Sequence, residues 1–313
     1  MNEGGQPGSQ APPDAAHAWH PRPPPHTLAM LHSLFHGTGG DLRNGWKALF
    51  FLLGAGICNG AAFAFRRELP WLGAVTWLPA PWFSFAALLC LTWIFLALEG
   101  RPLGAVGLRL DRRWGREFLL GALAGSGLIG LMAFGGYLGG GFHLARNPQA
   151  GLGSLLAGAW LYLAVAFSEE LLFRGYLFQR LRAGIGAWPT QGLLALLFAA
   201  AHWGNPGMAG ATRAWATCTI AVAAVLLGLC YLRTGSLALP IGLHLGWNWT
   251  QGTLMGFAVS GLPSTGWWTP VMHGRALWIT GGSFGLEASL PCVVIGIAAC
   301  LALAARPGRW FTG

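Results

Sequence analysis

The segment GSLLAGAWLYLAVAFSEELLFR, residues 153–174, decides how this chain is interpreted. Its first two thirds carry no charge, which is typical of a helix that crosses a lipid bilayer. Near its end stand two adjacent glutamates, Glu169 and Glu170, followed by Arg174. One charged side chain at the centre of a membrane helix costs about 2.5–3.5 kcal/mol. In a chain with only ten acidic residues, three charges in one apolar segment therefore indicate a functional site.

The composition of the chain excludes an ordinary soluble protein. Of its 313 residues 54% are hydrophobic and 9% are charged, and the mean hydropathy is +0.51. Apolar runs of about 20 residues, the length needed to span a bilayer, recur along the sequence. We predict an all-α fold, a polytopic membrane bundle of about eight transmembrane helices. The predicted spans are 48–65, 78–98, 117–140, 153–173, 188–202, 212–232, 236–257 and 284–305.

The sequence divides into a polar leader and a membrane domain. Residues 1–40 are rich in Pro, Gly and His and lack apolar periodicity, which predicts a disordered tail. Residues 41–313 form the predicted transmembrane domain, and the first apolar run lacks the features of a cleaved signal peptide. Weak transition-metal binding by the tail histidines is an alternative. Six cysteines fall inside predicted spans and are interpreted as packing residues: Cys58, Cys90, Cys218, Cys230, Cys292 and Cys300.

Positive charge predicts the orientation in the membrane. The net charge of +9 comes almost entirely from arginine, and five arginines cluster between the second and third spans. That loop is predicted to be cytoplasmic, together with the N-terminus, whereas Arg66 and Arg67 oppose this orientation. The basic balance indicates topology and contact with the lipid bilayer, with no nucleic-acid signature. The preference for Arg over Lys suggests a bacterial plasma membrane. The clustered arginines are Arg101, Arg109, Arg112, Arg113 and Arg116.

The candidate site extends beyond the first segment. Because Glu170 and Arg174 are four residues apart on a helix, they share one face and can pair, while Glu169 projects about 100° away. One span later, Phe198-Ala-Ala-Ala-His202 ends a strongly apolar run. Two spans after that, His244-Leu-Gly-Trp-Asn248 again places two polar side chains on one helix face.

These residue types suit the hydrolysis of a peptide bond by activated water. A Glu and a His can hold and deprotonate a water, while an Asn amide or a second His can donate to a developing oxyanion. The structural alternative is an ion pair between Glu170 and Arg174 with histidines that only pack between helices. Six such residues at helical spacings favour the catalytic interpretation.

The three motifs resemble the CAAX prenyl protease and bacteriocin-processing family of intramembrane endopeptidases. They read Glu169-Glu170-x-x-x-Arg174, Phe198-x-x-x-His202 and His244-x-x-x-Asn248, and the similarity covers about residues 150–305, including Thr280-Gly-Gly-Ser-Phe-Gly-Leu-Glu287. The resemblance implies a bundle whose acidic and histidine side chains converge on a cavity within the membrane. By the same resemblance Glu169 and His202 activate water, His244 and Asn248 hold the water or stabilise the oxyanion, and Arg174 positions Glu170.

The resemblance implies an intramembrane endopeptidase that cuts a membrane-associated peptide or protein. We predict no cofactor, with a zinc ion held by two His and a Glu as the alternative. The competing functions are a non-proteolytic scaffold that binds a membrane partner such as a sensor kinase and, third, a transporter or proton relay. A serine protease of the rhomboid kind fits poorly, because Ala124-Gly-Ser-Gly127 has Ala at its first position and lacks an evident His partner. Paired aspartates within spans are missing from the sequence.

The sequence also leads to an expectation about how deep Glu169 and His202 lie in the membrane. In a strict up-and-down bundle Glu169 lies near the cytoplasmic end of its span, and His202 lies near the opposite surface. A longer, tilted fourth helix would return Glu169 to the middle of the membrane.

Overall fold

The computed structural model describes Met1, residues 32–68 and residues 79–306. The chain divides into two compact units, Met1–Arg43 and Asn44–Gly313. The described part of the first unit holds a helical turn at residues 32–35 and an antiparallel bridge between His36 and Leu42. Most of the predicted Pro/Gly/His-rich tail falls on residues 2–31 and lies outside the described residues.

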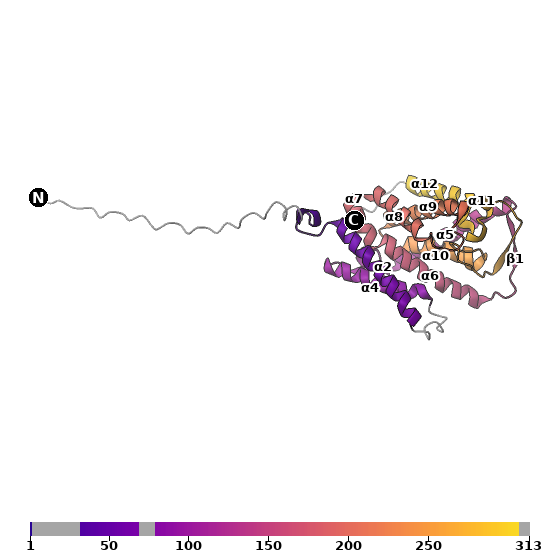
Figure 1. The fold of residues 1–313 in the computed structure, drawn as a ribbon, viewed down its shortest axis with the longest axis horizontal. Helices are drawn as coiled ribbons and strands as arrows, with labels where there is room; N and C mark the ends of the chain where they lie inside the picture. The colour runs from indigo at the N-terminus through magenta and orange to yellow at the C-terminus, as the bar shows by residue number, and fades with distance from the viewer. Residues whose placement is uncertain (2–31, 69–78, 307–313) are drawn as a thin grey trace. The chain divides into compact units, whose positions relative to one another are not determined.

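The second unit is a bundle of α-helices, as predicted (Figure 1). Each predicted apolar span coincides with a helix, and among the described residues five helical stretches are long and apolar enough to cross a membrane. Two further apolar helices, α8 and α12, are shorter. The eight helices are α2 (Asn44–Glu68), α4 (Ala80–Leu98), α5 (Arg112–Leu138), α6 (Leu152–Arg174), α8 (Ala187–Ala201), α9 (Gly210–Thr234), α10 (Ala238–Asn248) and α12 (Leu290–Ala305).

Three boundaries differ from the sequence prediction. Helix α5 begins at Arg112 rather than at residue 117, because the Asp111 side chain accepts a hydrogen bond from the Trp114 amide at 2.8 Å and caps the helix. The span predicted over 236–257 is α-helical only to Asn248 and continues as a π-helical turn, η2 (Trp249–Leu254). The last helix starts at Leu290, after the 3-10 turns η3 (Gly282–Phe284) and η4 (Leu286–Ala288).

Several elements had no counterpart in the prediction. Helix α7 (Tyr176–Ile185) follows α6 directly, with Gly175 at the junction, where a Cβ would overlap the Leu171 carbonyl oxygen. Strand β1 (Phe142–Arg146) pairs antiparallel with β2 (Trp268–Met272), with Phe142 opposite Met272. Two short elements complete the described part, η1 (Leu103–Val106) and α11 (Leu277–Thr280).

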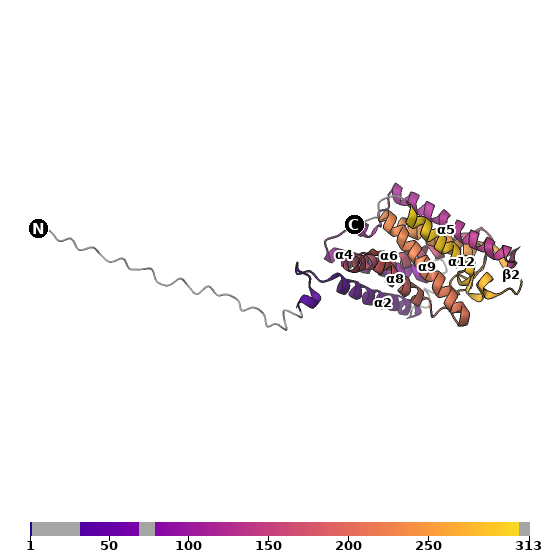
Figure 2. The ribbon, with the colours of Figure 1, turned by 90° about the horizontal axis from the view of Figure 1, so that it is seen from above.

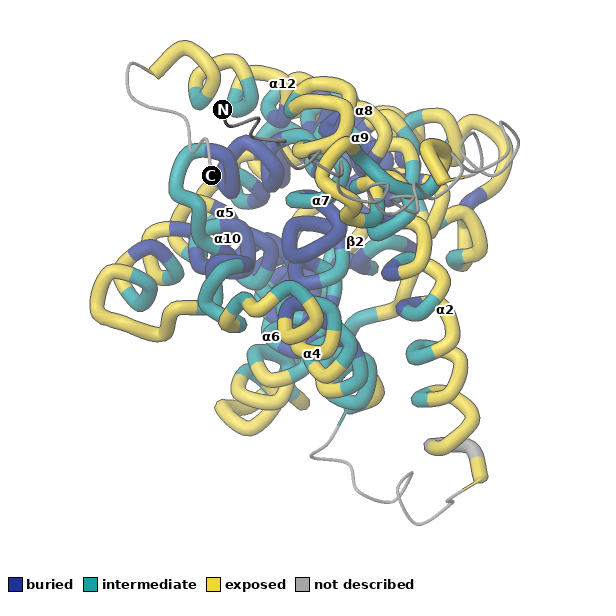
Figure 3. The backbone as a smooth tube through the Cα atoms, turned by 90° about the vertical axis from the view of Figure 1, so that its left-hand side faces the viewer, coloured by how far each residue is buried: buried dark blue, intermediate teal, exposed yellow. Residues whose placement is uncertain are grey.

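Helix α10 is enclosed by protein rather than exposed to lipid. Nine of its eleven residues are buried, and Figure 3 shows this interior in dark blue. It packs on α5 through glycines, because a Cβ at Gly125 would overlap the Leu243 carbonyl oxygen and one at Gly246 would overlap that of Ala122. Helix α12 packs against both α5 and α9 (Figure 2). Gly121 and Gly125 of α5 therefore let the backbones of α5 and α10 approach closely.

This close approach makes a first prediction. Gly125→Ala is expected to destabilise the protein by about 3 kcal/mol, because the new methyl group meets backbone atoms of α10 that cannot rotate away. Gly127→Ala, two residues further along the same helix, is the matched control, since a Cβ there has nothing within 4 Å. Thermal unfolding in detergent measures both variants. Equal melting temperatures for the two variants would contradict the packing.

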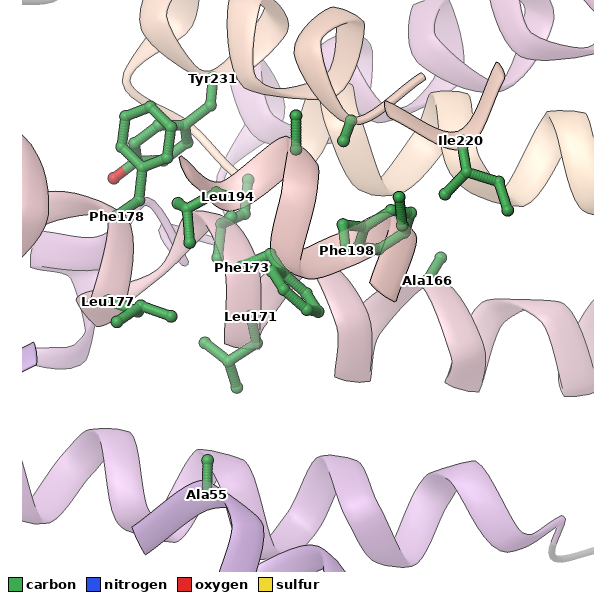
Figure 4. Close-up of a cluster of buried hydrophobic side chains, with 14 of the residues drawn as sticks. Ala55, Ala166, Leu171, Phe173, Leu177, Phe178, Leu194, Phe198, Ile220 and Tyr231 are labelled. Carbon is green, nitrogen blue, oxygen red and sulfur yellow. The ribbon is translucent and has the colours of Figure 1, made fainter. Parts of the chain in front are cut away.

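A buried apolar cluster holds α6, α7, α8 and α9 together. Phe173 of α6 and Phe198 of α8 meet edge to face, with ring centroids 4.9 Å apart (Figure 4). Phe178 of α7 packs in the same way on Tyr231 of α9, at 5.4 Å. Because Phe198 is the first residue of the predicted Phe-x-x-x-His motif, this cluster fixes the end of α8 against the segment that carries the glutamates.

An ionic cluster joins the ends of α2, α4 and α7. Glu99 accepts a hydrogen bond from the Tyr176 hydroxyl at 2.7 Å and lies 3.2 Å from Lys47 Nζ and 3.5 Å from Arg180 Nη1. Burial raises the pKa of the Glu99 carboxyl, but the Tyr176 hydrogen bond and the charges of Arg180 and Lys47 outweigh burial and hold the pKa below its usual value. Glu99 therefore stays ionised and ties three helices at one end of the bundle.

Candidate active site

Helix α6 carries a fully buried ion pair. Arg174 Nη1 donates to Glu170 Oε1 at 3.1 Å, and Nη2 donates to the Ala224 carbonyl of α9 at 2.9 Å. The side chains of Glu170 and Arg174 are 0% and 2% exposed. This confirms the pairing predicted from their spacing. Two ions taken out of water stabilise a protein only when their geometry is good, so the pair depends on both partners.

His244 of α10 lies between the two glutamates. Its Nδ1 is 2.8 Å from Glu170 Oε1, and its Nε2 is 3.8 Å from Glu169 Oε2. A carboxylate can only accept, so Nδ1 carries the proton in this contact and the tautomer is fixed. Glu170 Oε2 is buried and, among the described residues, lacks a hydrogen-bond partner. Glu169 differs from its neighbour because 30% of its side chain is exposed, which leaves it open to water.

His202 and Asn248 meet His244 at a cavity. The cavity offers about 40 Å³ to water-sized molecules, which is room for roughly two or three waters. His202 Nδ1 donates to the Phe198 carbonyl at 2.7 Å, so in the neutral ring Nε2 is the free acceptor. The walls of the cavity are otherwise mostly apolar, with Ile220, Leu227 and Trp247 among them. Polar groups there are poorly screened from one another.

The structure thus brings the six predicted residues together in two ways. Glu169, Glu170, Arg174 and His244 are linked by direct contacts. His202, His244 and Asn248 line one cavity, and His244 belongs to both sets. In the described part of the chain, Glu169 touches the cluster through His244 and does not line that cavity.

The structure also shows where Glu169 and His202 lie along their helices. The apolar stretch that contains Glu169 runs from Leu152 to Ile185, so Glu169 is 17 residues from one end (169 − 152) and 16 from the other (185 − 169). Helix α8 has 15 residues and is about 22 Å long, shorter than a hydrocarbon core of about 30 Å, so His202 at its end need not reach the far surface. Helix α6 itself ends at Arg174, close to the predicted end of the span, and the separate helix α7 follows it after Gly175.

Sequence reasoning did not assign Glu287 and Ser260 to the site, although both line the same cavity. Glu287 belongs to the glycine-rich segment before the last helix, which was noted for its family resemblance but given no role. Glu287 could have been found as a site candidate, because acidic residues are rare in this apolar chain. Ser260 carried no such signal, because one serine in a loop is common.

Within residues 32–68 and 79–306, the structure contains no group of three His, Cys, Asp or Glu side chains that could hold a metal ion. The six cysteines, all described, are free. The two that are buried, Cys230 and Cys292, contribute to the apolar interior.

The fold and the site together define an integral membrane protein with a polar cluster of glutamates, histidines and an asparagine enclosed by helices. Residues 151–250 match the family model described as type II CAAX prenyl endopeptidase Rce1-like, and this segment holds all six predicted residues. No curated protein and no solved structure matches the chain. The chain therefore carries an Rce1-like domain, and the resemblance found in its motifs is confirmed. At the level of the family, the match over residues 151–250 supports a CAAX-type intramembrane endopeptidase.

Proposed function

We propose that this protein hydrolyses a peptide bond of a membrane-associated peptide or protein with a water molecule activated by Glu169 and His202. The observation that carries the proposal is His244, held at Nδ1 by Glu170 at 2.8 Å and facing Glu169 across 3.8 Å through Nε2. An imidazole fixed in one tautomer beside a partly exposed carboxylate is an arrangement suited to acid–base chemistry. A scaffold has no need of it.

Each residue has a separate role in the proposed reaction. Glu169 accepts a proton from the water, whose oxygen attacks the carbonyl carbon of the substrate. His202, with Nε2 unprotonated, orients this water from the cavity that it lines with His244 and Asn248. Asn248 donates to the oxyanion that forms, while His244, whose Nδ1 proton is held by Glu170, helps to hold the water through Nε2. The C–N bond then breaks, and the amine nitrogen takes up the proton that Glu169 received.

The buried pair supports this chemistry indirectly. Arg174 neutralises Glu170 inside the protein, so Glu170 can remain an acceptor for His244 Nδ1. Glu170 and Arg174 therefore position the imidazole, while Glu169 exchanges protons. The division follows from exposure, because the Glu170 side chain is 0% exposed and that of Glu169 is 30% exposed.

The cofactor and the cellular setting are parts of the same proposal. We favour hydrolysis without metal, with zinc as the alternative. The charge distribution supports a bacterial plasma membrane with the N-terminus in the cytoplasm. A prenylated tail is only one of the possible substrates of a CAAX-type enzyme, so the substrate is proposed only as a membrane-associated peptide or protein.

Asn248→Ala tests the proposal through oxyanion stabilisation. Removal of the amide is expected to lower kcat by about 10²–10³-fold, which is the usual effect of losing one such donor. Cleavage of a membrane-anchored peptide by the protein in proteoliposomes, with and without chelator, measures it. The matched control is Asn59→Ala on α2, whose amide donates to the Ala55 carbonyl of its own helix, with activity expected within about two-fold of wild type. Equal kcat values for both variants would remove Asn248 from the mechanism.

A further inference from the structure

Glu287 is a buried acidic residue that the proposed reaction does not use. It lies in η4, lines the cavity together with His202, and interacts electrostatically with that imidazole. Its Oε2 accepts hydrogen bonds from the Ser260 amide and, at 3.2 Å, from the Ser260 hydroxyl. A carboxyl group in such surroundings is costly, because desolvation opposes its charge.

The backbone on both sides of the Glu287 contact adopts unusual conformations, at Gly285 and at Ser260. At Gly285, where φ is 98°, a Cβ would overlap the Ala258 carbonyl oxygen, so the turn that presents Glu287 requires glycine. Ser260 has a φ of 48°, and it is the one described non-glycine residue with a positive φ. Such a conformation persists where the surroundings hold it, and it is found most often at functional sites.

A chain of hydrogen bonds connects Glu287 to the turn that carries His202. The backbone N–H of Asn205 donates to the His202 carbonyl at 3.0 Å, and the side-chain Nδ2 of Asn205 donates to the Ser260 carbonyl at 2.8 Å. Ser260 in turn donates to Glu287. The carboxyl and the imidazole are therefore held at fixed positions on one cavity by elements that are 85 residues apart in sequence (287 − 202).

We propose that Glu287 is a positioning residue for His202, an acidic partner that orients the imidazole across the cavity and stabilises positive charge on it. The proposal rests on the proposed function for its role in catalysis. Glu287 forms and breaks no covalent bond. In the proposed reaction it keeps His202 Nε2, the nitrogen left free by the Phe198 contact, aimed at the water, and at low pH it stabilises the charge that His202 gains when Nε2 is protonated.

A purely structural role would not need an acid. The two Ser260 donors require an acceptor, which a glutamine amide supplies without charge. Burial opposes the negative charge of the Glu287 carboxylate, whereas the Ser260 hydrogen bonds and a positive charge on His202 favour it. The other groups around Glu287 include Gln251 of η2, whose side chain hydrogen-bonds to it, Tyr162 of α6, Cys292 of α12 and, on the same cavity, His244 of α10. Among these described neighbours, His202 and His244 are the ones that carry positive charge when protonated, and His244 already has Glu170 as its partner.

A double-mutant cycle on stability tests the proposal without any substrate. Melting temperatures of the full chain in detergent are measured for wild type, His202→Ala, Glu287→Gln and the double variant, from about pH 5 to 8, where histidine changes charge. We expect the shift in the double variant to differ from the sum of the single shifts by about 2 °C or more, in a pH-dependent way. The matched control is Glu117→Gln, another buried glutamate, which pairs with Arg113 and should be additive with His202→Ala.

Additive shifts at every pH would overturn the proposal. If Glu287→Gln yields no folded protein, Glu287→Asp takes its place in the cycle, since it keeps the carboxyl but withdraws it by one methylene, and additivity there overturns the proposal equally. In a cleavage assay Glu287→Gln should lower kcat about ten-fold or more with KM unchanged. Failure of wild type to cleave any peptide would count against the proposed function, while the coupling still decides the role of Glu287.

Discussion

Cleavage by the Glu169→Ala and His202→Ala variants is expected to fall by about 10²–10⁴-fold in kcat, because each change removes a group that moves or orients a proton of the attacking water. The loss should appear without unfolding. Glu169 is 30% exposed and makes its one described ion-pair contact at 3.8 Å, so the protein does not depend on it for stability. Peptide cleavage followed by mass spectrometry gives kcat, and thermal unfolding gives stability.

The adjacent glutamate is the control for this prediction. Glu170→Gln removes a charge of the same type one residue away, but Glu170 is fully buried between Arg174 and His244. It should lower stability as well as activity, whereas Glu169→Ala should lower activity alone. If both variants lost stability alike, or if Glu169→Ala retained wild-type kcat, the division of roles between the two glutamates would be wrong.

Arg174→Ala is expected to destabilise the protein by about 3–5 kcal/mol, the usual cost of leaving a buried charge without its partner. The variant leaves the Glu170 carboxylate, which is 0% exposed, without its cationic partner, and it also removes the donor to the Ala224 carbonyl of α9. The melting temperature in detergent measures the effect. Since α6 and α9 are joined through this guanidinium, the loss should be global rather than local.

Arg113→Ala is the matched control for Arg174→Ala. Arg113 also pairs with a glutamate four residues away, at 2.7 Å, but its side chain is 64% exposed. Because one member of this pair lies largely in solvent, the pair is better screened than Glu170–Arg174, so Arg113→Ala should lower the melting temperature much less than Arg174→Ala does. A Glu170→Gln/Arg174→Met double variant should recover part of the stability lost in Arg174→Ala, because it removes both charges. Equal effects of Arg174→Ala and Arg113→Ala would contradict the buried pair.

Much of the fold was predictable because hydrocarbon imposes a simple rule on sequence. A span must be apolar over about 20 residues, and each of the eight predicted segments is helical. Helix α7 escaped prediction because Gln179, Arg180 and Arg182 make it amphipathic and short. The β1–β2 pair escaped because it joins residues 130 positions apart (272 − 142), and no local pattern records such a pairing.

The candidate site was predictable to the extent that helical spacing fixes neighbours. The four-residue interval placed Glu170 beside Arg174, as the structure confirms. It could not show that His244 would lie between two glutamates of another helix, since that contact spans 74 residues and depends on the glycine-mediated approach of α10 to α5. Glu287 was missed for a related reason. Its position depends on tight turns at Gly281 and Gly285, and turns lack the regular spacing by which a helix reveals which residues are neighbours.

The most direct test of peptide hydrolysis at this site is a comparison of purified wild type and Glu169→Gln, both in detergent, against a library of membrane-associated peptides read by mass spectrometry. The account predicts new peptide termini with wild type and none with Glu169→Gln at equal stability. Cleavage that survives a chelator supports the metal-free reaction, and cleavage lost in chelator supports the zinc alternative. The same termini produced at the same rate by both proteins, or none produced by a folded wild type, would contradict the account and favour the scaffold.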